Sequence, residues 1–244
     1  IFPFEEDFLV GREVPVRYVG HPLACDMPLQ PDRPAARAAL GLDADRPVLA
    51  VLPGSRRSEV DRLARPFLQT AVRLKRELAE LQLVVPLVSE ATQRLFEEQR
   101  TRTAPDLALV TASGGSRLAL AAADVVLTAS GTATLEGLLS KRPMVVGYKL
   151  NAATYYAARL FRLVKVEHVA MANLLAGERL APELLQGECE PDHLLPPLRR
   201  FFDNAALRDE IAARYRDIHM ALRMDTNREA AAAVVGLLEG RGLV

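Results

Sequence analysis

The stretch that decides the fold is DVVLTASGTATLE, residues 124–136. The apolar run Val125–Thr128 predicts a buried strand, and the residues from Thr132 onward predict a helix. A helix that follows a strand through small residues presents open backbone N–H groups and partial positive charge at its N-terminus. Such a terminus favours a phosphate, although a capped helix on a core strand explains the same pattern.

Polar side chains accompany this turn. Ser130, Thr132 and Thr134 offer hydroxyl donors beside the expected helix terminus. Glu136 follows about one helical turn later, where its carboxylate can accept hydrogen bonds from sugar hydroxyls. On this stretch alone, a capped helix on a core strand is slightly favoured over a phosphate site.

A second turn of the same design lies earlier in the chain. The apolar run Val48–Leu52 predicts a strand, and Gly54, Ser55 and Arg56 lead from it into a helix. Arg56 has a planar guanidinium suited to phosphate, or it pairs on the surface with Glu59. Neither turn has the P-loop or dinucleotide-binding pattern. Two such turns predict one ligand held across the carboxyl edge of a parallel sheet.

Composition describes an ordinary globular chain. Half of the 244 residues are hydrophobic, a quarter are charged, and the formal net charge is zero. This balance gives no electrostatic footprint for nucleic acid, so we expect no nucleic-acid partner. The sequence contains no apolar run long enough for a membrane span. Since the chain begins at Ile1, we expect that an N-terminal portion of the protein is missing.

Metal ligation is not predicted. Cys25 and Cys189 are far apart in sequence and suggest buried thiols in a reducing compartment. The four histidines show no metal-ligand spacing. Asp43 and Asp45 precede a strand instead of following one, which favours a solvated turn.

The whole chain alternates strands and helices. Its strands are nearly continuous apolar runs, which predict an α/β fold with a doubly wound parallel sheet covered on both faces. A stretch with four prolines, residues 20–34, reads as an irregular connection. The predicted strands are 16–20, 48–52, 83–88, 107–111, 125–128 and 144–148, and the predicted helices are 34–40, 58–80, 90–101, 116–122, one from 132, 152–163, 205–222 and 226–238.

The predicted helix over residues 152–163 places aromatic residues beside arginines. Such a helix can rest on an anionic membrane surface, or it can be the solvated face of an ordinary surface helix. The pattern leaves both open.

Several strings together resemble the lipid-A-disaccharide synthases. They occur in the expected order and cover nearly the whole chain. The strings are Phe2–Glu5, Gly20–Leu23, Val51–Arg56 with Ser58–Val60, Val84–Val88, Ala129–Glu136, Pro143–Tyr148, Asn173–Gly177, Glu183–Gln186 and Glu188–Pro191. The resemblance implies the Rossmann-like half of a GT-B glycosyltransferase, followed by C-terminal helices.

The resemblance also implies roles for particular residues. Glu136 would hold the ribose, Asn173 would face the substrate cleft, and Glu59 would position Arg56 or serve as a helix N-terminal carboxylate. The remaining residues would bind the nucleotide: Gly54, Ser55 and Arg56 at the diphosphate, Ser130, Gly131, Thr132 and Ala133 cradling phosphate, and Gly147 and Tyr148 lining the uracil or sugar pocket.

The implied reaction is a hexosyl transfer. Such an enzyme moves 2,3-diacylglucosamine from its UDP donor to 2,3-diacylglucosamine 1-phosphate, giving lipid A disaccharide 1-phosphate and UDP. The resemblance implies inversion at the sugar and no metal or other cofactor. The acylated substrates further imply a cytoplasmic protein with peripheral contact to the inner face of the inner membrane. A homodimer is a further expectation, which the sequence leaves undecided.

The resemblance divides the chain into three parts. Residues 1–20 would end an N-terminal acceptor domain that is otherwise absent, and residues 21–204 would form the donor-nucleotide domain. Residues 205–244 would form helices that pack toward the absent domain and leave apolar surface exposed here. The general base is expected in that absent domain, so no catalytic residue is assigned in this chain.

Three alternatives compete with this interpretation. An enzyme like UDP-N-acetylglucosamine 2-epimerase would share the ribose glutamate, but does not explain the strings at Asn173–Gly177 and Glu188–Pro191. A non-catalytic UDP-binding module would act with a separate N-terminal chain. A flavodoxin-like signalling domain predicts an acidic residue after the first strand, where this chain has Gly54, Ser55 and Arg56.

Overall fold

The computed structural model describes residues 2–112, 115–150 and 168–239. Its centre is a six-stranded parallel sheet with the order β3-β2-β1-β4-β5-β6. The strands are β1 (Val48–Leu52), β2 (Gln82–Pro86), β3 (Val110–Ala112), β4 (Val125–Thr128), β5 (Met144–Tyr148) and β6 (Glu183–Leu185). The predicted doubly wound parallel sheet is confirmed.

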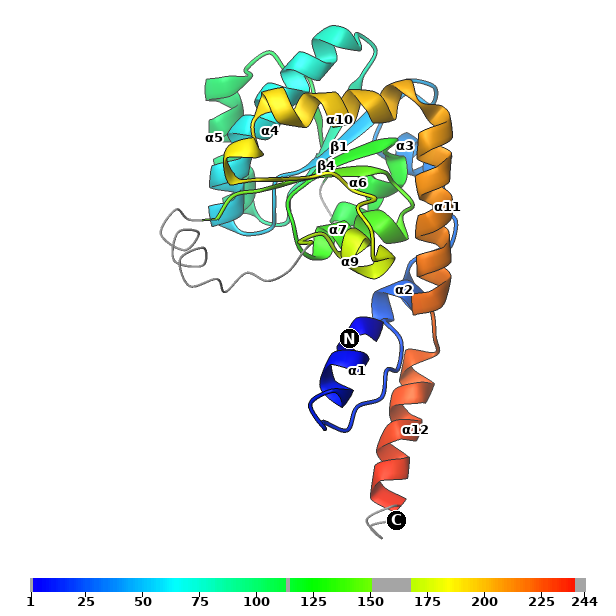
Figure 1. Ribbon diagram of the computed structural model, residues 1–244. Coiled ribbons are helices and arrows are strands. Elements are labelled where there is room, and N and C mark those ends of the chain that lie inside the picture. Colours follow the sequence, from blue (N-terminus) through cyan, green and yellow to red (C-terminus); the bar gives the residue numbers. More distant parts are fainter. Residues whose placement is uncertain (1, 113–114, 151–167, 240–244) are drawn as a thin grey trace.

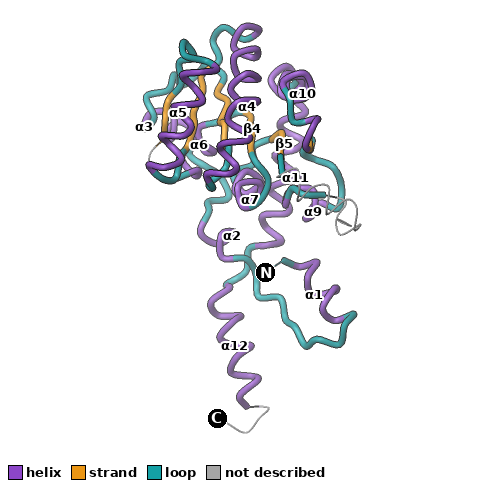
Figure 2. Tube along the Cα trace, turned by 90° about the vertical axis from the view of Figure 1, so that its left-hand side faces the viewer, coloured by secondary structure: helices purple, strands orange, loops and turns teal. Residues whose placement is uncertain are grey.

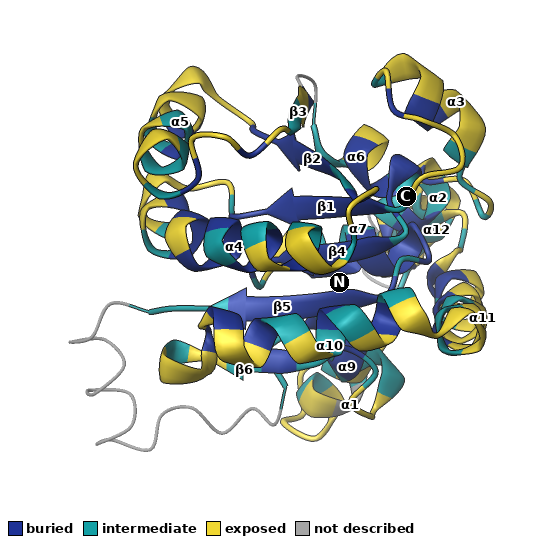
Figure 3. Ribbon diagram, turned by 90° about the horizontal axis from the view of Figure 1, so that it is seen from above, coloured by how far each residue is buried: buried dark blue, intermediate teal, exposed yellow. Residues whose placement is uncertain are grey.

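Helices cover both faces of this sheet (Figure 1). Helices α4 (Arg57–Glu77), α5 (Glu90–Thr103) and α10 (Pro191–Asp203) lie on one face. Helices α3 (Arg33–Ala39), α6 (Ser116–Ala122) and α7 (Thr132–Leu139) lie on the other, with α9 (Met171–Ala176) beside α7. Figure 3 shows why the strands read as continuous apolar runs, since β1, β4 and β5 are buried along almost their whole lengths.

Of the remaining elements, α1 (Pro3–Val10), α2 (Pro22–Asp26) and α12 (Thr226–Glu239) lie beyond one end of the layered domain (Figure 2). Helix α11 (Ala205–Leu222) packs against α7, α9 and α10, and the 3-10 helix η1 (Gln186–Glu188) follows β6. No residue within Thr226–Glu239 is buried, and Val234, Val235 and Leu237 are exposed. The domain boundaries at residues 20 and 204, and packing of α12 against an absent domain, stay predictions.

Several predictions about elements differ from the structure, and α1, α9 and β6 were not predicted. Residues 16–20 form no strand: Arg17 pairs with Glu229 of α12 at 2.7 Å, and the segment lies outside the sheet. The connection over residues 20–34 contains helix α2, with His21 as its N-cap. Helix α10 was not predicted because it contains Pro196 and Pro197, which remove backbone donors. The predicted helix over 152–163 lies outside the described residues.

A buried arginine fixes the starts of the two central strands. The Arg37 guanidinium donates to the carbonyl oxygens of Ala122 and Arg46 at 3.0 Å each, and pairs with Asp124 at 2.8 Å. Asp124 also accepts from the Val48 N–H at 2.8 Å. Because Asp124 precedes β4 and Val48 begins β1, this network sets the relative position of the strands that carry the site.

A buried lysine and histidine fix α11 to the same domain. Lys141 Nζ donates to His219 Nδ1 at 2.6 Å and to the Pro28 carbonyl at 3.0 Å, while His219 Nε2 donates to the Ala24 carbonyl at 2.8 Å. Burial lowers the pKa of Lys141 to about 8 and lowers the pKa of His219 below its ordinary value. The contact joins α2, α11 and the turn after α7.

Candidate functional site

The candidate site lies where the strand order reverses. Strand β1 is flanked by β2 and β4, and Leu52 at the end of β1 is in register with Thr128 at the end of β4. Two neighbouring parallel strands therefore end side by side, and Gly54 and Ser130 each follow two residues later. A crevice at such a reversal is the usual ligand site of an open α/β sheet.

The turn after β1 depends on a glycine. Gly54 has φ +120°, and a Cβ placed there would lie 2.4 Å from the Cβ of Glu59. The Glu59 carboxylate folds back over the turn and accepts from the N–H groups of Ser55 at 3.0 Å and Arg56 at 3.2 Å. The turn is thus held closed by a residue of the helix that follows it.

This closure changes what the turn offers an anion. The sequence suggested two turns with open N–H groups, but here two of those groups bond Glu59. The Arg56 side chain remains 81% exposed, and its guanidinium nitrogen lies 3.7 Å from a Glu59 oxygen. The first turn therefore offers an exposed cation and the Ser55 hydroxyl instead of a cluster of open backbone N–H groups.

The turn after β4 keeps the open design. Gly131 is the N-cap of α7 with φ +99°, and nothing lies within 4 Å of the position of an added Cβ. The N–H groups of Thr132 and Ala133 begin the helix, where they have no intrahelical acceptor. Thr134 instead serves the fold, since it donates to the Gly131 carbonyl at 2.7 Å and accepts from the Met171 N–H at 2.9 Å.

Glu136 lies one turn into α7, beside the start of α6. The Ser116 hydroxyl, from the first residue of α6, donates to Glu136 Oε2. The α7 terminus and the Glu136 carboxylate thus lie along one helix, as the sequence predicted.

A cavity of about 490 Å³ unites these elements. Its size suits a small ligand. Nine of the twelve predicted site residues line it, namely Gly54, Ser55, Arg56, Glu59, Ser130, Gly131, Thr132, Ala133 and Glu136, together with Leu52, Pro86, Leu87, Val88, Gly115, Ser116, Arg117 and Ala129.

The sequence interpretation missed one wall of this cavity. Pro86–Val88 lie at the end of β2 and Gly115–Arg117 follow β3, on the same carboxyl edge as the two predicted turns. The available signal was their position at the end of one predicted strand and after another. Arg117 is an exposed cation there, and the structure gives it no ion pair within the described ranges.

Three predicted residues are not among those that line the cavity. Gly147 is buried in β5, where an added Cβ would lie 2.6 Å from the Phe67 ring and 2.8 Å from Cys189 Sγ. Its small size is therefore explained by packing. Tyr148 ends β5 and is partly exposed.

Asn173 is placed inside the fold. It is fully buried in α9, and its amide donates to the Ala181 carbonyl and accepts from the Ala181 N–H, each at 2.8 Å. These bonds fix the loop between α9 and β6. The prediction that Asn173 faces the cleft therefore differs from the structure, because its polar atoms serve this loop.

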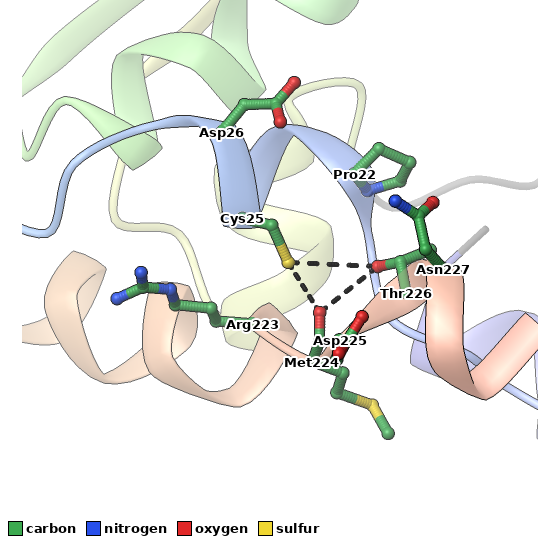
Figure 4. A pocket seen from close by; sticks show the side chains of 8 residues that line it. All are labelled: Pro22, Cys25, Asp26, Arg223, Met224, Asp225, Thr226 and Asn227. Atoms are coloured by element: carbon green, nitrogen blue, oxygen red, sulfur yellow. Dashed lines mark hydrogen bonds between the residues drawn. The ribbon is translucent and has the colours of Figure 1, made fainter.

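A second cavity of about 480 Å³ lies between α2 and the α11–α12 junction (Figure 4). The Cys25 thiol donates to the Met224 carbonyl at 2.5 Å and lies 3.9 Å from the Thr226 hydroxyl. These contacts join α2 to the start of α12. Figure 4 shows the Asp26 carboxylate pointing away from the Cys25 thiol.

The described residues contain no group of three or more histidine, cysteine or acidic side chains placed to hold a metal ion. Asp43 accepts from the N–H groups of Asp45 at 2.9 Å and Arg46 at 3.3 Å, in keeping with a turn. Burial raises the pKa of the Cys189 thiol to about 12, which makes it unreactive. In the parts of the chain that the structure covers, no helix is both long and apolar enough to cross a bilayer.

Comparisons with known proteins agree with this geometry. The chain matches the family model for lipid-A-disaccharide synthetase over residues 1–235. A lipid-A-disaccharide synthase from Mannheimia succiniciproducens is 44% identical over 243 residues, which cover 98% of this chain and 61% of that protein. The chain therefore spans less than two thirds of the length of this curated relative.

Two solved structures share the fold. A UDP-GlcNAc 2-epimerase from Neisseria meningitidis, bound to UDP-GlcNAc, has a TM-score of 0.57 at 10% identity, covering 96% of this chain and 59% of that one. WaaG, a glycosyltransferase involved in lipopolysaccharide biosynthesis, has a TM-score of 0.50 at 18% identity, covering 83% and 50%. At these identities the likeness extends to the GT-B fold and no further.

The family assignment rests on the sequence matches. It excludes the alternative that the chain belongs to the UDP-N-acetylglucosamine 2-epimerase family. The doubly wound sheet, the cavity at its reversal point and the match over residues 1–235 agree with one another. The chain belongs to the lipid-A-disaccharide synthetase family.

Proposed function

We propose that the cavity between the β1 and β4 turns binds the UDP part of a UDP-linked sugar. The observation that carries this proposal is the convergence of Arg56, the α7 N-terminus and the Glu136 carboxylate on one cavity. The first two suit a diphosphate, and the third suits the hydroxyls of a ribose. Family membership supports a nucleotide sugar as the donor.

The chemical contribution of this site is stabilisation of the leaving group. When the bond between sugar and phosphate breaks, negative charge grows on the departing UDP. In this proposal the N–H groups at Thr132 and Ala133 and the guanidinium of Arg56 face that charge. Glu59 keeps the Arg56 turn closed, which holds the cation at the edge of the cavity.

For the whole enzyme we propose transfer of 2,3-diacylglucosamine from UDP to 2,3-diacylglucosamine 1-phosphate, with this chain as the donor-binding part. The matches to lipid-A-disaccharide synthases support this reaction. We assign no general base among the described residues. Contact with the inner face of the inner membrane belongs to the same proposal, since both substrates carry acyl chains. A homodimer stays a prediction.

The ribose role of Glu136 is tested by comparing two ligands. Glu136→Ala removes a charged acceptor, so UDP affinity should fall about 10- to 100-fold. Inorganic pyrophosphate has no ribose, and its affinity should stay unchanged. Isothermal titration calorimetry measures both constants, and equal losses for the two ligands would contradict the assignment.

The phosphate role of Arg56 is tested with the same ligands. Arg56→Ala should weaken UDP and pyrophosphate together, by about tenfold, because both lose one charge-assisted contact. Arg57→Ala is the matched control, since Arg57 is the adjacent exposed arginine and does not line the cavity. Unchanged pyrophosphate affinity in Arg56→Ala would remove Arg56 from the site.

A further inference from the structure

We propose that Ser116 is a positioning residue for Glu136, and that it sets how strongly the site recognises a ribose. The Ser116 hydroxyl donates to Glu136 Oε2, although the two residues lie twenty positions apart in sequence. This inference rests on the proposed binding of UDP, because it concerns the orientation of the carboxylate that would hold the ribose.

The hydroxyl is free to take this role because it does not cap its own helix. Ser116 is the first residue of α6, and the N-cap before it is Gly115 with φ +108°, which has no side chain. No side-chain cap bond is made at this terminus. Helix α6 packs against α7, and this contact brings Ser116 to Glu136.

Glu136 has no other polar anchor in the described part of the chain. No lysine or arginine there forms an ion pair with its carboxylate, and the bond from Ser116 is its one side-chain hydrogen bond. A glutamate has three rotatable side-chain bonds, so an unanchored carboxylate must be ordered by the ligand at an entropic cost. Ser116 pre-orders it.

The carboxylate retains capacity for a sugar after it has bonded Ser116. A carboxylate has two oxygens and about four acceptor positions. With one position on Oε2 filled, the others can accept from the neighbouring 2′ and 3′ hydroxyls of a ribose. Glu136 lies four residues after Thr132, roughly 6 Å along the helix axis from the open terminus. A diphosphate at the terminus therefore leaves room for the ribose at the carboxylate.

The test titrates the purified protein with UDP, 2′,3′-dideoxy-UDP and inorganic pyrophosphate. The wild type should prefer UDP over the dideoxy analogue. Ser116→Ala should lower UDP affinity about tenfold and leave the affinities for the other two ligands unchanged. Ser116→Thr keeps the hydroxyl and should restore the preference for UDP. In a Glu136→Ala background, Ser116→Ala should cause no further loss.

Each contrary result has a distinct meaning. Equal losses for all three ligands in Ser116→Ala would show a general structural effect and overturn the inference. An unchanged preference for UDP in Ser116→Ala would overturn it also, while Glu136 and the proposed function would stand. A wild type that does not distinguish UDP from its dideoxy analogue would remove the ribose role of Glu136 itself, and with it both proposals.

Discussion

Gly54→Ala is the substitution that tests the architecture of the site most sharply. The added Cβ would lie 2.4 Å from Glu59 Cβ and 2.5 Å from Glu59 Oε2, and Gly54 has φ +120°. Backbone strain costs about 2 kcal/mol. Displacing Glu59 breaks its bonds to the N–H groups of Ser55 and Arg56, at about 1 kcal/mol each for such exposed bonds. We therefore expect destabilisation by about 3 to 4 kcal/mol.

Gly41→Ala is the matched control. Gly41 also has a positive φ, +66°, but nothing lies within 4 Å of the position of its added Cβ. It should cost about 1 kcal/mol, from conformational strain alone. Urea unfolding measures both changes, and the transition should shift without a change in its slope. If Gly54→Ala costs no more than Gly41→Ala, then Glu59 does not close the turn as described.

Three further predictions concern the frame around the site. Arg37→Met should lower the free energy of unfolding by about 3 to 5 kcal/mol, because it leaves Asp124 without its buried partner. Arg33→Met is the control, since it removes a half-exposed partner of the same carboxylate and should cost at most about 1 kcal/mol. Urea unfolding measures both changes. Gly147→Ala should lower the free energy of unfolding by about 1 to 3 kcal/mol through overpacking, with equal effects on UDP and pyrophosphate affinity. A loss of affinity for UDP alone would show that Gly147 lines the nucleotide pocket. Burial lowers the pKa of His219 from 6.5, so below that pH the unfolded state takes up a proton that the native state refuses, and stability should fall as pH drops. His219→Gln should flatten this slope, and an unchanged slope in unfolding experiments across pH would contradict the assignment.

The strands that carry the site were predictable from local sequence. The strands 48–52, 125–128 and 144–148 were predicted with the bounds that the structure shows, because continuous apolar runs bounded by turn residues mark strands buried on both faces. The same reasoning failed at residues 16–20, a short segment with two valines and a tyrosine that lies beside α12. Local pattern does not reveal whether a partner strand exists.

Helix α10 shows a different limit. Its prolines argue against a helix, yet Leu194, Leu198 and Phe201 are buried on one side of it against the sheet. Packing of that apolar side outweighs the missing backbone donors. The apolar periodicity of this helix is present in the sequence despite its prolines.

The site was predictable as two turns, but its details depended on tertiary structure. The pairing of Leu52 with Thr128 decides that the turns face one cavity. Ser116 joins the site only because α6 packs on α7. Gly147 and Asn173 show the converse, since sequence does not separate a glycine needed for packing, or a buried amide, from residues that face a ligand.

The occupied N–H groups of the first turn had a sequence signal. Glu59 lies three residues after Arg56, the N-cap of α4, where a glutamate reaches back to the backbone at the helix start. The motif is therefore compatible with a closed turn as well as with a phosphate contact, and the closed turn was not predicted. The structure indicates that the α7 terminus, where Gly131 is the N-cap, provides the open donors.

The central claim is that the cavity between β1 and β4 is a UDP site, and calorimetric titration with UDP tests it most directly, with ADP as the control ligand. The account predicts that UDP binds without added metal, more tightly than ADP, and that Glu136→Ala weakens this binding. Absence of UDP binding, equal binding of ADP, or full UDP affinity in Glu136→Ala would contradict it.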